Sequence, residues 1–131
     1  MKILATPDPA KSKALLEMAK VSMRRLAEID GQKYPSNTLT DYYDILHKCM
    51  DALVCLEGVK IKGEGAHQEL IDYISKRHGL GEAVRRFLQE LREYRNRIAY
   101  EGFTVTKEYI TSNTRRIEDI LQLLMSLCKL D

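Results

Sequence analysis

Residues 82–99 read EAVRRFLQELREYRNRIA, and the spacing of apolar side chains in this stretch decides the fold class. These side chains recur three and four residues apart, as they do along one face of an amphipathic α-helix. They are Val84, Phe87, Leu88, Leu91, Tyr94 and Ile98. The pattern therefore predicts a helix over residues 82–99, and Gly102 is expected to close it.

The same spacing recurs along the rest of the chain. The expected helices cover about residues 8–31, 38–57, 66–77 and 82–99, and a fifth is capped by Thr104 or Thr106 and continues to Leu127. The first begins with Asp8 and Pro9, residue types that favour a helix start. Residues 32–37, which contain Pro35, and the glycine-rich stretch 59–65 are expected to be loops. Residues 103–106 have a β-like composition but are too few to form a sheet. The prediction is an all-α, up-and-down bundle of four long helices plus one short helix, in a single domain spanning residues 1–131.

Composition indicates an ordinary globular protein. The chain has 131 residues, of which 44% are hydrophobic and 31% charged, enough for one buried core. Cys49, Cys55 and Cys128 are odd in number and lack C-x-x-C spacing, so neither a disulfide framework nor a zinc site is expected. The N-terminal apolar run is too short for a signal peptide, and no stretch approaches the ~20 apolar residues that span a bilayer. We expect a cytoplasmic protein without membrane association, metal or cofactor.

Charge is unevenly distributed. Residues 76–97 hold seven basic and three acidic side chains, a net charge of +4, whereas residues 39–58 hold one basic and four acidic side chains, a net charge of −3. One interpretation is a pair of solvated or complementary helix faces. The other is a basic ridge that attracts phosphate groups.

Arg95 interrupts the apolar face of the helix at 82–99. On a helical wheel it lies roughly 20° from Val84, inside the apolar stripe. An unpaired buried arginine is very costly, so Arg95 needs a carboxylate, an anion, backbone carbonyls or an opening to water. The aspartates of residues 38–57 lie opposite that helix's own apolar stripe and are not obvious partners. Two interpretations remain open: Arg95 extends to the end of the bundle, or it meets a phosphate or a partner chain in a cleft.

Three short motifs occur in an order and at spacings that resemble a known family. The late part of the helix at 82–99 has Arg95 and Asn96, with Tyr100 at the last position of an R-x4-H pattern. Residues 42–47 read YYDILH and residues 66–71 read AHQELI. Together these segments resemble the HEPN domains (higher eukaryotes and prokaryotes nucleotide-binding), which are small all-α bundles.

The resemblance implies a homodimer in which the motif helices share a cleft. Many HEPN proteins are metal-independent ribonucleases, often toxins, and others accompany a nucleotidyltransferase. By position, Arg95 would hold a phosphate and Asn96 would orient the reacting groups. Tyr100 stands where the nucleases have histidine, and a phenol with a pKa near ~10 is a poor general base at neutral pH.

The expected function is therefore that of a homodimeric module that binds nucleotide or RNA phosphates, beside a nucleotidyltransferase partner. The first alternative is a metal-independent ribonuclease of toxin type, with Arg95, Asn96 and Tyr100 as catalytic residues. The second is a structural helical adaptor. The residues expected to contact phosphate or nucleotide are Arg95, Asn96, Arg97, Arg92, Tyr43 and His47.

Overall fold

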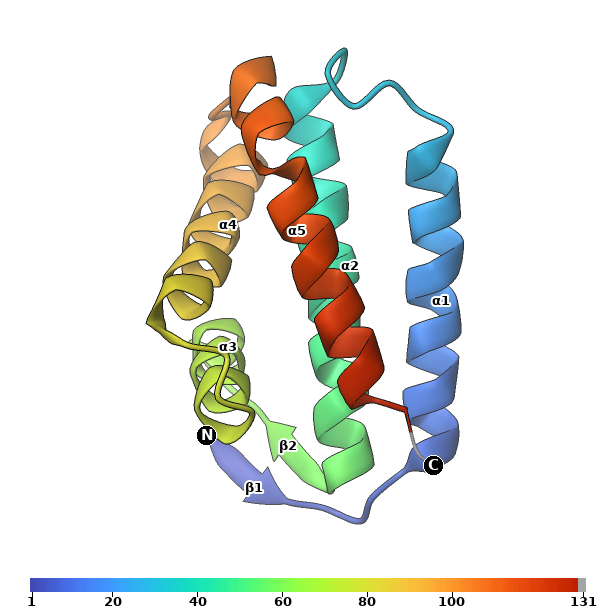
Figure 1. The fold of residues 1–131 in the computed structure, drawn as a ribbon. Helices are drawn as coiled ribbons and strands as arrows, with labels where there is room; N and C mark the ends of the chain where they lie inside the picture. Colours follow the sequence, from blue (N-terminus) through green and yellow to red (C-terminus); the bar gives the residue numbers. More distant parts are fainter. Residues whose placement is uncertain (130–131) are drawn as a thin grey trace.

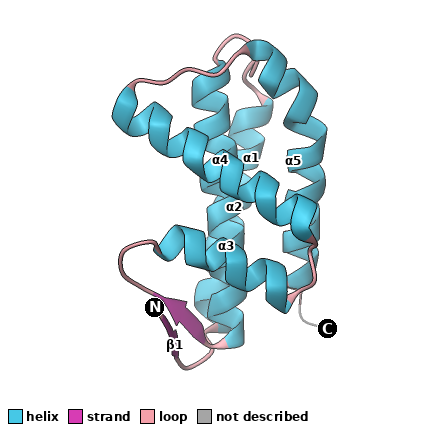
Figure 2. Ribbon diagram, turned by 90° about the vertical axis from the view of Figure 1, so that its left-hand side faces the viewer, coloured by secondary structure: helices cyan, strands magenta, loops and turns pink. Residues whose placement is uncertain are grey.

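The central element of the fold is a long helix, α2 (Pro35–Glu57). In the computed structural model, which describes residues 1–129, α2 contacts each of the other four helices (Figure 1). These are α1 (Pro9–Ala27), α3 (Ala66–Arg77), α4 (Glu82–Glu101) and α5 (Lys107–Leu127). Figure 2 shows the shorter α3 and the longer α4 in front of α2. The all-α fold class is confirmed.

Two short strands form a small sheet that the sequence analysis did not predict. Strand β1 (Lys2–Leu4) pairs antiparallel with β2 (Val59–Ile61), with Lys2 opposite Ile61 and Leu4 opposite Val59. Residues 59–61 are thus not part of a loop, and no strand forms at residues 103–106. The pairing joins the N-terminus to a segment more than 50 residues away, so local sequence carries little signal for it.

Helix ends agree with the sequence at most positions. Asp8 caps α1, because its carboxylate accepts a hydrogen bond of 3.0 Å from the backbone nitrogen of Lys11. Thr106 caps α5 by accepting a bond of 3.2 Å from the backbone nitrogen of Tyr109. Gly58 and Gly102 end α2 and α4 in the left-handed conformation that glycine tolerates best.

Two expected boundaries were wrong. Helix α1 ends at Ala27, before Gly31. Helix α2 begins at Pro35, inside the segment expected to be a loop, because proline is well suited to the first position of a helix. The Thr38 hydroxyl donates a hydrogen bond of 3.1 Å to the carbonyl of Gly31, which holds the connection between α1 and α2.

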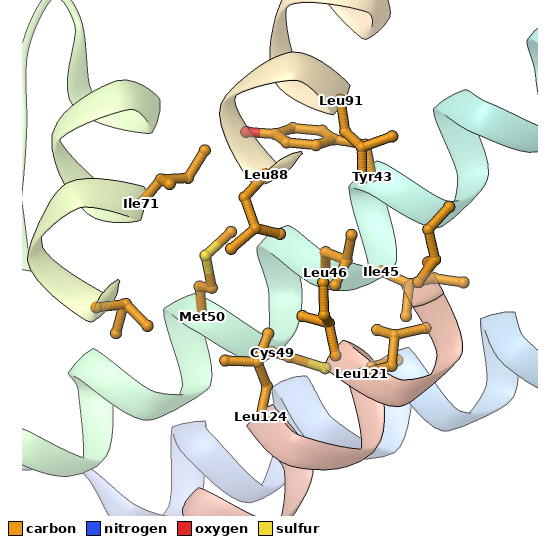
Figure 3. Close-up of a cluster of buried hydrophobic side chains, with 14 of the residues drawn as sticks. Tyr43, Ile45, Leu46, Cys49, Met50, Ile71, Leu88, Leu91, Leu121 and Leu124 are labelled. Carbon is orange, nitrogen blue, oxygen red and sulfur yellow. The ribbon is translucent and has the colours of Figure 1, made fainter. Parts of the chain in front are cut away.

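The core surrounds α2 on most of its circumference. Figure 3 shows α2 side chains meeting Ile71 of α3, Leu88 and Leu91 of α4, and Leu121 and Leu124 of α5. Full burial of such a side chain contributes about 1.5–3 kcal/mol. Five of the partly exposed α2 residues share one arc of the helix: Asp44, His47, Lys48, Asp51 and Cys55.

Two further expectations concern the cysteines and the membrane. All three cysteines are free thiols, and Cys49 and Cys128 are buried in the core. None of the helices within residues 1–129 combines the length and the apolar character needed to cross a membrane.

Candidate anion-binding site

Arg95 lies on α4 against the partly exposed arc of α2. Its side chain is 27% exposed, and its Nε lies 3.4 Å from Oδ1 of Asp44. The expectation that the aspartates of α2 face away from Arg95 is therefore wrong for Asp44. The physical reason is that α2 is the central helix, so its polar arc also meets a neighbour, in this case α4.

The pairing of Arg95 with Asp44 leaves the guanidinium donors largely unused. The contact does not have the geometry of a hydrogen bond, and the buried Nε of Arg95 has no hydrogen-bond partner among residues 1–129. A guanidinium carries five N–H donors in a planar fork. The described part of the chain offers Arg95 a nearby negative charge but no hydrogen-bond acceptor for these donors.

Two histidines lie in the same region. His47 of α2 and His67 of α3 stack with their ring centroids 4.0 Å apart and their planes 22° from parallel. Tyr43, one turn before His47, directs its hydroxyl to within 3.4 Å of Nδ1 of His67. We call Tyr43, Asp44, His47, Asp51, His67, Arg92 and Arg95 the histidine–arginine cluster.

Burial and the arginines set the protonation of this cluster. Burial raises the pKa of Tyr43 to about 12, although Arg92 and Arg95 oppose the shift, so the phenol keeps its proton at neutral pH. Burial also lowers the pKa of His47, and the positive charge of Arg95 acts in the same direction. For His67, burial, the neighbouring His47 and both arginines lower the pKa. Both imidazoles are therefore mainly neutral at pH 7.

The surroundings of the two rings favour opposite tautomers. His47 places Nδ1 3.2 Å from Oδ2 of Asp51. A carboxylate repels a nitrogen lone pair, so the hydrogen of neutral His47 belongs on Nδ1, and Nε2 is left as an acceptor. The Tyr43 hydroxyl lies 3.4 Å from Nδ1 of His67, and in the arrangement where the hydroxyl donates, the hydrogen of that ring is on Nε2. In this arrangement the pair offers one acceptor and one donor nitrogen.

Arg92 adds a second guanidinium one turn before Arg95. Its Nε donates a hydrogen bond of 2.7 Å to Oε1 of Gln89, and its Nη2 lies 3.6 Å from Oε1 of Glu93. Its charge acts on the pKa values of Tyr43 and His67. Arg92 therefore contributes positive potential to the cluster while its position is fixed along its own helix.

The structure gathers only some of the residues expected at the site. Arg92, Arg95, Tyr43 and His47 come together. Asn96 is partly buried one residue beyond Arg95. Arg97 points to another neighbour, with its guanidinium carbon 3.9 Å from the centroid of the Phe103 ring. Tyr100 is 80% exposed and lies roughly 140° around α4 from Arg95 on a helical wheel.

Sequence reasoning missed three members of the cluster: Asp44, Asp51 and His67. The two aspartates were placed opposite the apolar stripe of their helix, and no role at the site was expected of His67. Within residues 1–129, no group of three or more His, Cys, Asp or Glu side chains is arranged to hold a metal ion. The motif AHQELI did contain His67, but only the packing of α3 against α2 brings its ring onto His47.

The chemistry available here is the recognition of an anion. The surface between α2, α3 and α4 is partly exposed, and it carries an arginine fork with free donors, a second arginine and a neutral imidazole N–H.

Comparisons with protein-family models, with curated proteins and with solved structures find no match for this chain.

Proposed function

We propose that the histidine–arginine cluster binds phosphate groups of a nucleotide or of RNA. The observation that carries the proposal is Arg95, whose guanidinium is partly buried between helices without a hydrogen-bond acceptor among residues 1–129. Arginine forks bind phosphate oxygens through two parallel N–H bonds. A phosphate at this place supplies the acceptors that Arg95 lacks.

The neighbours of Arg95 support the same ligand. With Tyr43 donating to Nδ1, the Nε2–H of neutral His67 is a further donor, and His67 is exposed. Arg92 adds positive charge from the same helix. Asp44 opposes an incoming anion, but it is 42% exposed, so it is screened by water and can move away from Arg95.

The resemblance to HEPN domains completes the proposal. It supports a cytoplasmic homodimer of an up-and-down bundle of four long helices and one short helix, acting beside a nucleotidyltransferase. Asn96, Arg97 and Tyr100 lie beyond Arg95 at the end of α4, and Tyr100 is exposed and available to a second chain. Light scattering at micromolar concentration tests the dimer: we expect twice the mass of one chain, and a monomer would contradict this part of the proposal.

A calorimetric titration tests the binding site itself. The ligands are ATP and a short ribo-oligonucleotide, and the variant is Arg95→Met, which keeps much of the side-chain length but removes the charge. Hydrogen bonds to charged groups contribute about 1.5–3 kcal/mol, so the variant should bind about tenfold or more weakly. The matched control is Arg115→Met, at an exposed arginine of α5, which should bind like the wild type. Equal weakening by both substitutions would contradict the proposed site.

A second candidate function is metal-independent cleavage of RNA at the same cluster. The observation that favours it is the stacked pair of imidazoles, because with Asp51 beside Nδ1 of His47 and Tyr43 donating to Nδ1 of His67, Nε2 of His47 can accept a proton and Nε2–H of His67 can donate one. In such a step the 2′-hydroxyl loses its proton to His47 while its oxygen bonds to phosphorus. The bond from phosphorus to the 5′-oxygen then breaks, and that oxygen takes a proton from His67.

Cleavage is tested with a 5′-labelled RNA. The expected product ends in a 2′,3′-cyclic phosphate, and either His47→Ala or His67→Ala should remove it. The substitution Tyr100→Phe, which removes only the hydroxyl, asks whether the motif position contributes instead. Cleavage that survives both histidine substitutions but requires Tyr100 would contradict this mechanism. A protein that neither binds nor cleaves would leave the structural adaptor as the better description.

A further inference from the structure

A cavity of about 340 Å³ lies beside the C-terminal end of α2, next to the histidine–arginine cluster. Its walls come from the N-terminal segment, α1, α2 and β2. The residues that matter here are Lys11, Leu15, Asp51, Val54, Cys55 and Ile61. The volume is within the range of about 300–1,000 Å³ that is typical of small-molecule sites.

Asp51 belongs to both the cavity and the cluster. It lines the cavity wall, and its Oδ2 lies 3.2 Å from Nδ1 of His47. His47, Asp51 and Cys55 follow one another at four-residue intervals along one arc of α2. At a rise of 1.5 Å per residue, Asp44, which Arg95 contacts, lies about 10 Å along the helix axis from Asp51 at the cavity wall. The cavity and the cluster thus form one continuous stretch of this arc.

The cavity combines apolar walls with polar groups at its edge. Leu15, Val54 and Ile61 supply hydrocarbon surface from three different elements. Asp51 supplies a hydrogen-bond acceptor and Lys11 a donor. Apolar faces with polar edges suit a heteroaromatic ring, whose faces are apolar and whose edge carries donors and acceptors. A free sugar fits less well, because hydroxyls against the apolar walls would lose hydrogen bonds to water.

We propose that this cavity receives the base of a nucleotide whose phosphate lies at the histidine–arginine cluster. The inference rests on the proposed function, since it requires a phosphate beside Arg95. The ribose of the nucleotide then spans the surface near Asp51, between the phosphate and the base. The ligand unit is a nucleoside monophosphate, either free or as one residue of an RNA strand.

Cys55 provides a direct reporter of the cavity. It lines the cavity and is half-buried, whereas Cys49 and Cys128 are buried in the core and serve as internal controls. Iodoacetamide should therefore modify Cys55 first, and mass spectrometry locates the modified thiol. The probes are AMP, GMP, adenosine, inorganic phosphate and a short ribo-oligonucleotide, each added to the full chain. Shifts of the ring signals of His47 and His67 in NMR spectra report occupancy of the cluster in the same samples.

The inference predicts that AMP or GMP slows modification of Cys55 at least fivefold and shifts the signals of His47 and His67. Inorganic phosphate should shift the histidine signals without protecting Cys55, and adenosine should protect only at higher concentration. Arg95→Met should lose the protection, and Arg115→Met should keep it. Protection by the oligonucleotide at lower concentrations than by AMP would identify RNA as the source of the nucleotide.

Two outcomes overturn the inference in distinguishable ways. If AMP and GMP shift the histidine signals but leave the modification rate of Cys55 unchanged, phosphate binds at the cluster and the cavity is not the base site. If neither nucleotide nor phosphate shifts the signals of His47 and His67, the proposed function fails and the inference fails with it.

Discussion

The imidazole rings of His47 and His67 stack with their centroids 4.0 Å apart, although they come from different helices and are twenty residues apart in the sequence. Two stacked imidazolium cations at this distance would repel each other. The stacked pair can therefore carry at most one positive charge. This relationship makes the cluster sensitive to pH and to nearby anions.

The stability of the fold should fall as pH is lowered through the range in which histidine titrates. The pKa values of His47 and His67 lie below the ordinary value of 6.5 in the folded chain. The unfolded chain therefore takes up protons first, and the free energy of unfolding should decrease between about pH 7.5 and pH 5.5. Urea unfolding at several pH values measures this dependence.

The variant His67→Gln isolates the contribution of the stack. Because one titrating ring is removed, the decrease in unfolding free energy over the same pH range should be smaller than in the wild type. Burial raises the pKa values of Asp41 and Asp51, which gives a pH dependence of the opposite sign at more acidic pH, but both proteins contain these residues. The same pH dependence in both proteins would show that His67 is not held mainly neutral.

The ion pair between Arg95 and Asp44 should contribute little to stability. Its side chains are 27% and 42% exposed, and the 3.4 Å contact lacks hydrogen-bond geometry. A double-mutant cycle with Arg95→Met and Asp44→Asn should give a coupling energy of about 0.2–1 kcal/mol. A coupling of about 3 kcal/mol or more is expected only for a buried pair, and it would mean that Arg95 is committed to the fold rather than to a ligand.

Tyr43→Phe should lower the unfolding free energy by about 0.5–1.5 kcal/mol, because it removes the hydrogen bond to Nδ1 of His67. It should also allow His67 to populate both neutral tautomers, and the nitrogen chemical shifts of the ring report their ratio. The matched control is Tyr73→Phe, at a partly buried tyrosine of α3. Equal losses of stability in the two variants would argue that the Tyr43 hydroxyl does not hold His67.

Gly58→Ala should destabilise the chain more than Gly102→Ala. Both glycines end a helix with positive φ, 74° and 68°, so both substitutions carry a backbone cost of about 1–2 kcal/mol. At Gly58 an added Cβ would also lie 2.7 Å from the backbone oxygen of Ala5, whereas at Gly102 it meets no atom of residues 1–129 within 4 Å. Equal decreases in unfolding free energy for the two variants would show that the segment linking β1 to α1 moves aside without a cost in free energy.

The sequence predicted the parts of the fold that depend on local periodicity and capping. The α3 bounds and the caps at Asp8 and Thr106 follow from side chains within a few positions of the helix ends. The strand pair could not be predicted in this way, because three-residue strands that pair over more than 50 residues leave no pattern within either segment.

The candidate site was predicted in part. Arg95 stood out because it interrupts an apolar stripe, and that signal led to the cluster. The contributions of Asp44, Asp51 and His67 depend on how α2, α3 and α4 pack, which helical periodicity does not specify. Conversely, Arg97 and Tyr100 are close to Arg95 in the sequence but lie on other faces of α4, because successive helical residues are rotated by 100°.

Histidine NMR during a titration with AMP tests the central claim most directly. The chain has three histidines, and His78, whose Nε2 lies 2.8 Å from Oε2 of Glu57 near the far end of α3, is an internal control. Phosphate binding at the cluster predicts saturable shifts of the ring signals of His47 and His67, an unchanged His78, and loss of these shifts in Arg95→Met. Unchanged signals for His47 and His67, or a shift of His78 as large as theirs, would contradict it.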